Sequence, residues 1–316
     1  MFVSPSVNDG AEKKRPGRRR VCAVRAFFAK GGVRVSLLAE KLRSVWKNWN
    51  DGRERRPLRP EFGGVPGSAL RHEVKYEISS HEFRSIRERL QACMTLDSHA
   101  QPAGKYRVHN LYFDTLNDTA LWEKETGVDP RFKFRIRCYD DLASGKEYQH
   151  LHLEKKFKWN GLGAKVSAPL EMEDVKAILA GEWAGRDFRQ SAREWTAEEA
   201  LLEEFRLLIA NRLLFPKVIV DYVREPYVMS LGNVRVTLDY HLRRGLWCDL
   251  FPDYDCVTLP ALDAPMIMEV KWDEALPGVN DKNGVRFLPP PLVRNLIRVG
   301  GGELAVNFSK YAQCRK

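Results

Sequence analysis

The amino-acid sequence predicts an α+β fold built around an antiparallel β-sheet or barrel. Strand-like runs are many and helical segments few, and the two do not alternate in the strict order that a parallel sheet requires. In most of these runs apolar and charged residues alternate, as expected of a strand with one buried face. With 316 residues, 44% of them apolar, the chain can bury a core of ordinary size.

Residues 1–69 form a basic extension that we expect to be largely disordered. Residues 1–60 hold 16 Lys and Arg against 5 Asp and Glu, whereas residues 61–316 hold 36 against 37, so the net charge of +10 resides in the extension. Within it, Val33–Trp49 has apolar residues at helical spacing with Lys and Arg between them, which predicts one amphipathic helix. Such a helix could contact an anionic membrane surface or a membrane protein, or dock on its own domain.

Three further features bear on the cellular setting. The sequence has no run of about 18 apolar residues and no compact apolar core of a secretory signal at its start. Its six cysteines contain no C-x-x-C pair, which favours reduced thiols. We therefore expect a cytoplasmic location, with membrane association through the extension as an option. Nucleic acid is not expected as a specific partner, because any segment so basic binds phosphate backbones.

Beyond a linker at residues 50–68, a folded domain is predicted over residues 70–316. Ser79 with Glu82 and Thr196 with Glu199 form capping boxes, which predict helices over Ser79–Cys93 and Thr196–Leu214. Two more helices are predicted at Met172–Leu179 and Pro291–Val299. The predicted strands are Glu73–Ile78, Asn110–Phe113, Arg131–Tyr139, His150–Lys158, Pro216–Val223, Asn233–Tyr240 and Met266–Trp272.

The stretch RFKFRIRCY, Arg131 to Tyr139, places four cations on one face of a strand. Since side chains on a strand alternate between two faces, Arg131, Lys133, Arg135 and Arg137 share one side. Like charges aligned in this way repel one another unless an anion lies along them. Since residues 61–316 are nearly balanced in charge overall, this cationic strand must be offset elsewhere, which indicates an internal segregated charge and not a broad polyanion-binding surface.

Other predicted strands also carry charges that share one face. These are Arg71, Glu73, Lys75 and Glu77 in the first strand, Glu154, Lys156 and Lys158 in the fourth, Arg235 and Asp239 in the sixth, and Glu269 and Lys271 in the seventh. One such face alone is an ordinary solvated sheet surface. Five together favour a closed or nearly closed barrel with a charged, hydrated interior. A cationic interior with a few carboxylates suits a phosphate chain together with a divalent metal ion.

An ordered set of motifs then points to a family. EVKYEI, NLYFDT, RFKFRIRCY, HLEKKFKWNG, PKVIVDYVREPY, VRVTLDYHL, IMEVKW and FSKY follow one another over about residues 70–313. Together they resemble the VTC domain, the polyphosphate polymerase domain of the vacuolar transporter chaperone complex, which is a triphosphate tunnel metalloenzyme. The resemblance implies a tunnel that binds ATP and polyphosphate, with Mn²⁺ or Mg²⁺ as cofactor, and a phosphotransferase activity.

The resemblance also implies roles for individual residues. Arg135, Arg137, Lys156 and Arg224 would clamp the reacting phosphates, and Glu269 would hold the metal, with Glu154 as a second candidate ligand. The remaining cations would bind substrate, namely Lys75, Lys165, Lys310, Lys158 and Lys271. Asp239 shares a charged face with this group.

Two departures from related proteins leave alternatives open. Tunnel triphosphatases begin with E-x-E-x-K, whereas this chain has R-H-E-V-K, with Arg71 in place of the first glutamate. The difference favours the polymerase over a triphosphatase that hydrolyses triphosphate or a nucleoside triphosphate. The inositol-phosphate-sensing domain and the membrane helices of the eukaryotic complexes are not found. The third alternative for the function is a non-catalytic module that binds polyphosphate.

Overall fold

The computed structural model describes residues 71–141, 146–159, 162–183, 196–229, 233–245, 259–261, 265–273, 295, 298 and 306–315. The chain divides at Arg59 into two compact units, and every described residue belongs to the second, Pro60–Lys316. The predicted basic extension, its amphipathic helix and the linker lie outside the described residues, as does almost all of the helix predicted at Pro291–Val299. No helix in the described part of the chain is long and apolar enough to cross a membrane.

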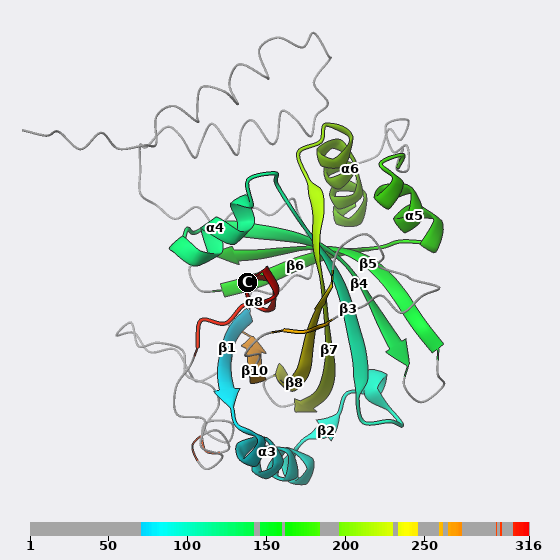
Figure 1. Cartoon of the computed structure of the whole chain (residues 1–316). Helices are drawn as coiled ribbons and strands as arrows, with labels where there is room; N and C mark the ends of the chain where they lie inside the picture. Colours follow the sequence, from blue (N-terminus) through cyan, green and yellow to red (C-terminus); the bar gives the residue numbers. More distant parts are fainter. Residues whose placement is uncertain are drawn as a thin grey trace, which may run out of the picture. The chain divides into compact units, whose positions relative to one another are not determined.

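A closed antiparallel barrel dominates the second unit (Figure 1). Its strands follow the spatial order β7-β3-β4-β5-β6-β1-β10-β8, and the pairing of β8 with β7 closes the ring. Short strands β2 (Thr95–Leu96) and β9 (Leu259–Pro260) are added to β7 and β8. The barrel strands are β1 (Arg71–Ile78), β3 (Tyr106–Asp114), β4 (Arg131–Asp141), β5 (Lys146–Trp159), β6 (Leu162–Pro169), β7 (Phe215–Met229), β8 (Val234–Gly245) and β10 (Met266–Asp273).

The predicted fold class is therefore confirmed, and all seven predicted strands are present. The structure adds three strands that the sequence did not predict, and β6 is the one that matters because it is needed to close the ring. Its sequence, LGAKVSAP, contains Gly, Ala and Ser and no clear alternation of apolar and polar residues. Among the described residues, β6 pairs with β1 at Gly163, opposite Arg71.

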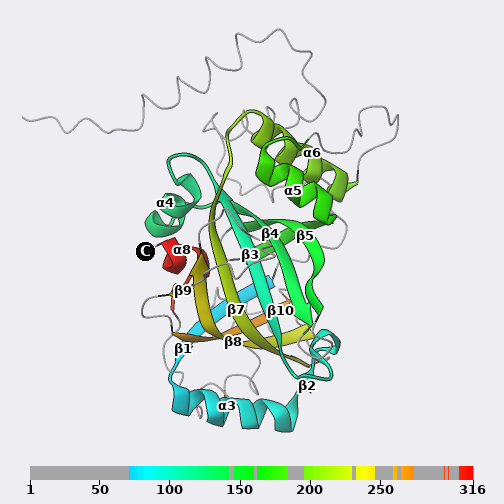
Figure 2. The same ribbon diagram turned by 45° about the vertical axis from the view of Figure 1, so that its right-hand side comes forward.

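Helices α3, α5 and α6 lie outside the barrel (Figure 2). Both predicted capping boxes form, Ser79 with Glu82 at the start of α3 (Ser80–Cys93) and Thr196 with Glu199 at the start of α6 (Ala197–Ala210). In both views α3 lies at one end of the barrel and α5 (Met172–Ala180) with α6 at the other. Helix α4 (Thr119–Thr126) was not predicted, and it lies beside α8 (Lys310–Arg315), while η1 (Ser98–Ala100) is a single turn.

The apolar faces of the strands pack outward against these helices. Leu111, Phe134 and Leu153 of adjacent strands form one cluster with residues of α5 and α6, among them Phe205, which is fully buried. A second cluster packs α3 against β1, β8 and β10. The third cluster lies on the inner faces of β3 and β7, where Val108 and Tyr222 pack with Tyr311 and Cys314 of α8. Because the helices cover the outer apolar faces, the charged faces of the strands are directed into the barrel.

One ionic group is buried on the outer face as well. The imidazole of His109 on β3 lies between two carboxylates, with Nε2 2.8 Å from Asp140 Oδ2 and Nδ1 3.1 Å from Asp221 Oδ1. Burial alone would lower the pKa of His109, but the two aspartates outweigh it and raise the pKa to about 9. His109 is therefore a charged bridge between β4 and β7, the two neighbours of its own strand.

Candidate functional site

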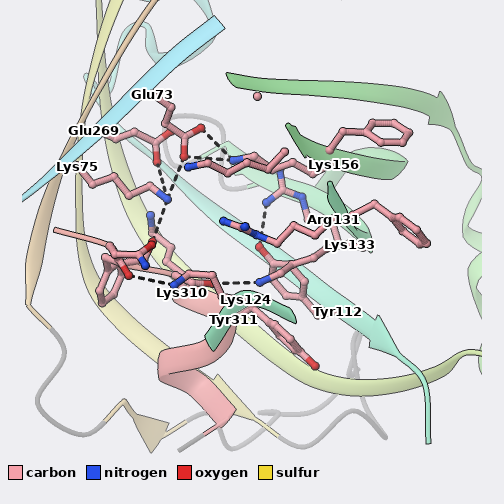
Figure 3. A pocket seen from close by; sticks show the side chains of 18 of the residues that line it. Glu73, Lys75, Tyr112, Lys124, Arg131, Lys133, Lys156, Glu269, Lys310 and Tyr311 are labelled. Carbon is pink, nitrogen blue, oxygen red and sulfur yellow. Dashed lines mark hydrogen bonds and ion pairs between the residues drawn. The ribbon is translucent and has the colours of Figure 1, made fainter. Parts of the chain in front are cut away.

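The cationic face of β4 lines a cavity inside the barrel, as its alternation predicted (Figure 3). Phe134, Ile136 and Cys138, the residues between these cations, are buried on the opposite side of the strand. Charged and tyrosine side chains from other strands and from the C-terminal segment complete what we call the barrel cavity. It is lined by Glu73, Lys75, Tyr112, Lys124, Arg131, Lys133, Arg135, Arg137, Lys156, Lys158, Tyr222, Arg224, Glu269, Lys271, Ser309, Lys310 and Tyr311, among others.

Two carboxylates stand together on one wall of the barrel cavity. The register of β1 and β10 places Glu73 opposite Lys271 and Lys75 opposite Glu269, so that acids and bases alternate. Lys75 Nζ lies 2.9 Å from Glu73 Oε1 and 3.8 Å from Glu269 Oε2. Lys156 of β5 reaches across to Glu73 at 3.0 Å (Figure 3). Glu73 is thus a central residue of the site that sequence reasoning did not select, although it shares a face with Lys75.

Both carboxylates are ionised in this setting. Burial and the neighbouring Glu269 each act to raise the pKa of Glu73, but Lys156, Lys75 and Lys271 outweigh them and hold it well below its usual range. The pKa of Glu269 is likewise lowered, since burial is outweighed first by Lys271 and then by Lys75. An ionised pair of this kind is a suitable ligand set for Mg²⁺ or Mn²⁺, which proteins commonly bind with one or two carboxylates and substrate phosphates.

The described residues contain no group of three or more His, Cys, Asp or Glu side chains placed to hold a metal. A metal ion held by Glu73 and Glu269 could take its further ligands from water or phosphate oxygens.

Glu154, the second candidate metal ligand, has a different environment. Its side chain is almost fully buried, and Oε2 accepts hydrogen bonds from Arg135 Nε at 2.8 Å and Nη2 at 2.5 Å. Oε1 accepts a hydrogen bond from Lys165 Nζ at 2.7 Å, and Arg137 Nη1 lies 4.0 Å from Oε2. Because Glu154 is not among the residues that line the barrel cavity and Arg135 contacts it at two points, the geometry favours positioning of Arg135 and Lys165 over metal binding.

Two tyrosines orient the arginines of β4. Arg135 Nη1 donates to the hydroxyl of Tyr112 at 3.1 Å, and Arg137 Nη2 donates to the hydroxyl of Tyr222 at 2.9 Å. Arg137 Nε also donates to Asn110 Oδ1 at 2.9 Å. Burial would raise the pKa of Tyr112, but Arg135 and Arg137 outweigh it and lower the pKa. These tyrosines were not selected from the sequence, where they look like ordinary core aromatics.

Arg224 and Lys310 share one buried carboxylate, that of Asp239. Arg224 forms a two-point contact with it, Nε to Oδ1 and Nη2 to Oδ2, both at 2.7 Å. Lys310 Nζ donates to Oδ2 at 2.6 Å. Burial acts to raise the pKa of Asp239, but Arg224 and then Lys310 outweigh it and lower the pKa. Asp239 therefore holds two predicted substrate-binding cations, from β7 and from α8, at one place.

The C-terminal segment, residues 306–315, is fastened to the barrel by its own hydrogen bonds. Val306 N donates to the carbonyl of Lys75 at 2.8 Å, and Lys75 Nζ donates to the carbonyl of Phe308 at 3.2 Å. The Tyr311 hydroxyl donates to Asp114 Oδ2 at 2.7 Å. The segment is thus one wall of the barrel cavity, which explains how a residue as late in the chain as Lys310 reaches it.

The structure brings most of the predicted site residues together. Lys75, Arg135, Arg137, Lys156, Lys158, Arg224, Glu269, Lys271 and Lys310 all line the barrel cavity. Lys165 is exposed, and neither Lys165 nor its partner Glu154 is among the lining residues. Arg71 does not line the cavity, and its Nη2 donates to the backbone carbonyl of Asn233 at 2.6 Å. Lys133, Tyr112 and Tyr222 are lining residues that the sequence did not single out as site residues.

The sequence model of the VTC domain matches residues 70–316. The chain belongs to the VTC domain family. The predicted resemblance is therefore confirmed over the whole of the barrel. Membership of the family, together with the cationic barrel cavity, supports a triphosphate tunnel enzyme as the class of this VTC protein.

Solved structures similar to this VTC protein are distant in sequence. PH1819 from Pyrococcus horikoshii is 14% identical, with a TM-score of 0.40, and the match covers 77% of this chain and 96% of that one. HpAC1 from Hippeastrum, a candidate adenylyl cyclase said to have a dominant triphosphatase activity, is 14% identical, with a TM-score of 0.44 and coverage of 78% and 95%. The comparison with curated proteins gives no match. No residue role is taken from these similarities.

Proposed function

We propose that this VTC protein transfers the γ-phosphoryl group of ATP to the end of a polyphosphate chain. The observation that carries the proposal is the convergence of Arg135, Arg137, Lys156 and Arg224 on one cavity whose wall also holds an ionised pair of glutamates. A phosphoryl group in transfer spreads negative charge over its oxygens, and fixed cations stabilise that charge. The residues named would act by positioning and by neutralising charge, without a covalent intermediate on the protein.

The proposed reaction needs no protein nucleophile. An oxygen of the terminal phosphate of the chain would attack the γ-phosphorus, the bond between that phosphorus and the β–γ bridging oxygen would break, and ADP would leave with the electron pair. Arg135 and Arg137 are held by Glu154, Asn110 and two tyrosines, so their guanidinium groups are pre-oriented for phosphate oxygens. Glu269 and Glu73 would hold Mn²⁺ or Mg²⁺, which would supply positive charge to offset that of the phosphates.

Hydrolysis of a triphosphate in the same cavity is the alternative that the chemistry allows, with water in place of the chain. The position of Arg71 supports the polymerase over this alternative. On β1 only Glu73 contributes a carboxylate to the barrel cavity, because Arg71 lies outside it, bonded to the carbonyl of Asn233. Glu73 could hold a metal together with Glu269. No second carboxylate on β1 would then be available to activate water, as hydrolysis requires.

Incubation with ATP and Mn²⁺, followed by separation of the products on a gel that resolves polyphosphate lengths, tests the proposal. A ladder from the wild type and none from Arg135→Ala/Arg137→Ala is expected. Arg84→Ala removes an exposed arginine of α3, outside the barrel, and should leave the ladder intact. Free phosphate without a ladder would indicate a triphosphatase in place of a polymerase. If the protein binds polyphosphate but shows no turnover, it would be a binding module.

A further inference from the structure

A second cavity adjoins the barrel cavity, between α4 and the C-terminal segment. Lys124 and Glu125 of α4 line it together with residues of the segment 306–313, and we call it the side cavity. It shares four lining residues with the barrel cavity, namely Lys124, Asn307, Phe308 and Ser309. A molecule bound in one cavity can therefore extend into the other.

The two cavities differ in charge. The barrel cavity is lined by eleven Lys and Arg residues and by two glutamates, Glu73 and Glu269. Among the described residues that line the side cavity, only Lys124 and Glu125 are charged, and their formal charges cancel. Because a phosphate in the side cavity would meet Glu125 beside a single cation, this cavity suits an uncharged occupant that carries polar groups.

Lys124 lies at the boundary between the two cavities. Its Nζ donates to the backbone carbonyl of Asn307 at 3.1 Å, which joins α4 to the C-terminal segment. Burial and then Arg131, Lys75 and Lys158 lower the pKa of Lys124, whereas Glu125 acts to raise it. Lys124 thus senses cations on the barrel side and an acid on the other. A ligand whose anionic part ends at Lys124 and whose neutral part continues beyond it would match this change of charge.

The side cavity offers the groups that recognise a nucleoside. Asn307 is exposed, and within the described residues only its backbone carbonyl takes part in a hydrogen bond. An asparagine amide presents a donor beside an acceptor, a pattern that matches N6 and N7 of adenine. Phe308 is half-buried, lines both cavities and provides an aromatic side chain on which a base can stack. A carboxylate such as that of Glu125 accepts hydrogen bonds from ribose hydroxyls.

We propose that the side cavity binds the nucleoside of the phosphoryl donor while the triphosphate of the same molecule lies in the barrel cavity. This assignment rests on the proposed function and adds to it a means of recognising adenosine. Asn307 would pair with the base, Phe308 would stack on it and Glu125 would accept from the ribose. A nucleoside is neutral, polar and joined to three phosphates, as the change of charge at Lys124 requires.

Binding measured by calorimetry in EDTA tests the nucleoside site without turnover. The two ligands are the β,γ-imido analogue of ATP and tripolyphosphate, which has no nucleoside. Asn307→Ala should lose about fivefold or more in affinity for the ATP analogue and about twofold at most for tripolyphosphate. Asn117→Ala removes an amide from an exposed position before α4 and should change neither affinity.

Ala312→Leu tests the same cavity by filling it. Ala312 lines the side cavity and not the barrel cavity, so the larger side chain should obstruct the nucleoside and spare the triphosphate. We expect a loss of about tenfold or more for the ATP analogue and about twofold at most for tripolyphosphate. Ala92→Leu, at an exposed position of α3, is the matched control and should change neither affinity. Because Asn307 is exposed, Asn307→Ala keeps the test decisive even if Ala312→Leu does not fold.

Equal losses for the two ligands, or an unchanged affinity of Asn307→Ala for the ATP analogue, would overturn the nucleoside site. The outcome is independent of the polyphosphate assay. A selective loss in a protein that forms no ladder would support the nucleoside site and remove the polymerase, whereas a ladder without selective loss would leave the polymerase and remove the nucleoside site.

Discussion

Replacement of Glu154 by Gln tests the view that this carboxylate positions cations and does not hold the metal. Glu154 is the shared partner of Arg135 and Lys165, with Arg137 4.0 Å away. Loss of one member of a buried ion pair costs about 3–5 kcal/mol, because the remaining charge is left unpaired. Lys165 is more than half exposed and adds little to that cost, so Arg135 and Arg137 account for most of it.

Urea unfolding of wild type and Glu154→Gln provides the measurement. We expect the variant to lose about 3 kcal/mol of unfolding free energy without ligand. Saturating tripolyphosphate should reduce this difference, since phosphate oxygens take over as partners of the two arginines. Glu173→Gln, on the exposed side of α5, is the matched control and should lose about 0.5 kcal/mol at most.

A metal-binding measurement distinguishes a Glu154 that positions cations from a Glu154 that holds the metal. Titration of Mn²⁺ in the presence of a non-hydrolysable triphosphate should give the same affinity for wild type and Glu154→Gln, and a weaker affinity for Glu269→Gln. The reasoning fails if Glu154→Gln is as stable as the wild type, or if it weakens Mn²⁺ binding as much as Glu269→Gln does.

Three further predictions concern other parts of the barrel. Because the folded pKa of His109 is about 9, above its unfolded value near 6.5, its stabilisation is complete below about pH 6 and lost as the pH rises through 9. The difference in unfolding free energy between wild type and His109→Gln should therefore be larger at about pH 6 than at about pH 10, and a constant difference would contradict the charged bridge. Tyr222→Phe removes the hydroxyl that accepts from Arg137, and it should lower the rate of phosphoryl transfer about tenfold and the unfolding free energy by about 1–3 kcal/mol, since a buried N–H loses its acceptor. Lys310→Met leaves Asp239 intact but should weaken polyphosphate binding about tenfold by calorimetry, and an unchanged affinity would place Lys310 outside the substrate site.

Side-chain alternation was enough to predict the charged inner face of five strands, β1, β4, β5, β8 and β10. It placed Arg135 and Arg137 in the cavity because a strand has a fixed period of two, and nothing in the tertiary structure alters that. Alternation does not give the register between strands, however. The partners of Glu154 on β4 and β6 depend on that register, so its engagement by Arg135 and Lys165 could not be predicted.

Other features had weaker signals in the sequence. Lys310 entered the prediction only through the family motif FSKY, since nothing in its neighbours indicates that the segment returns to the barrel. Glu73 was not predicted as a site residue, although the alternation that selected Lys75 places Glu73 on the same face of the strand. Strand β6 was missed because Gly and Ala carry almost no strand pattern.

The position of residues 306–315 has a consequence for synthesis of the protein. The chain leaves the ribosome from its N-terminus, so all eight strands of the ring emerge before this segment. A nascent chain can therefore pair its strands while Lys310 and Tyr311 are still unmade, and the cavity then lacks one wall. Until the segment is made, the strands would also lack Tyr311 and Cys314, which complete one of the buried clusters of the barrel.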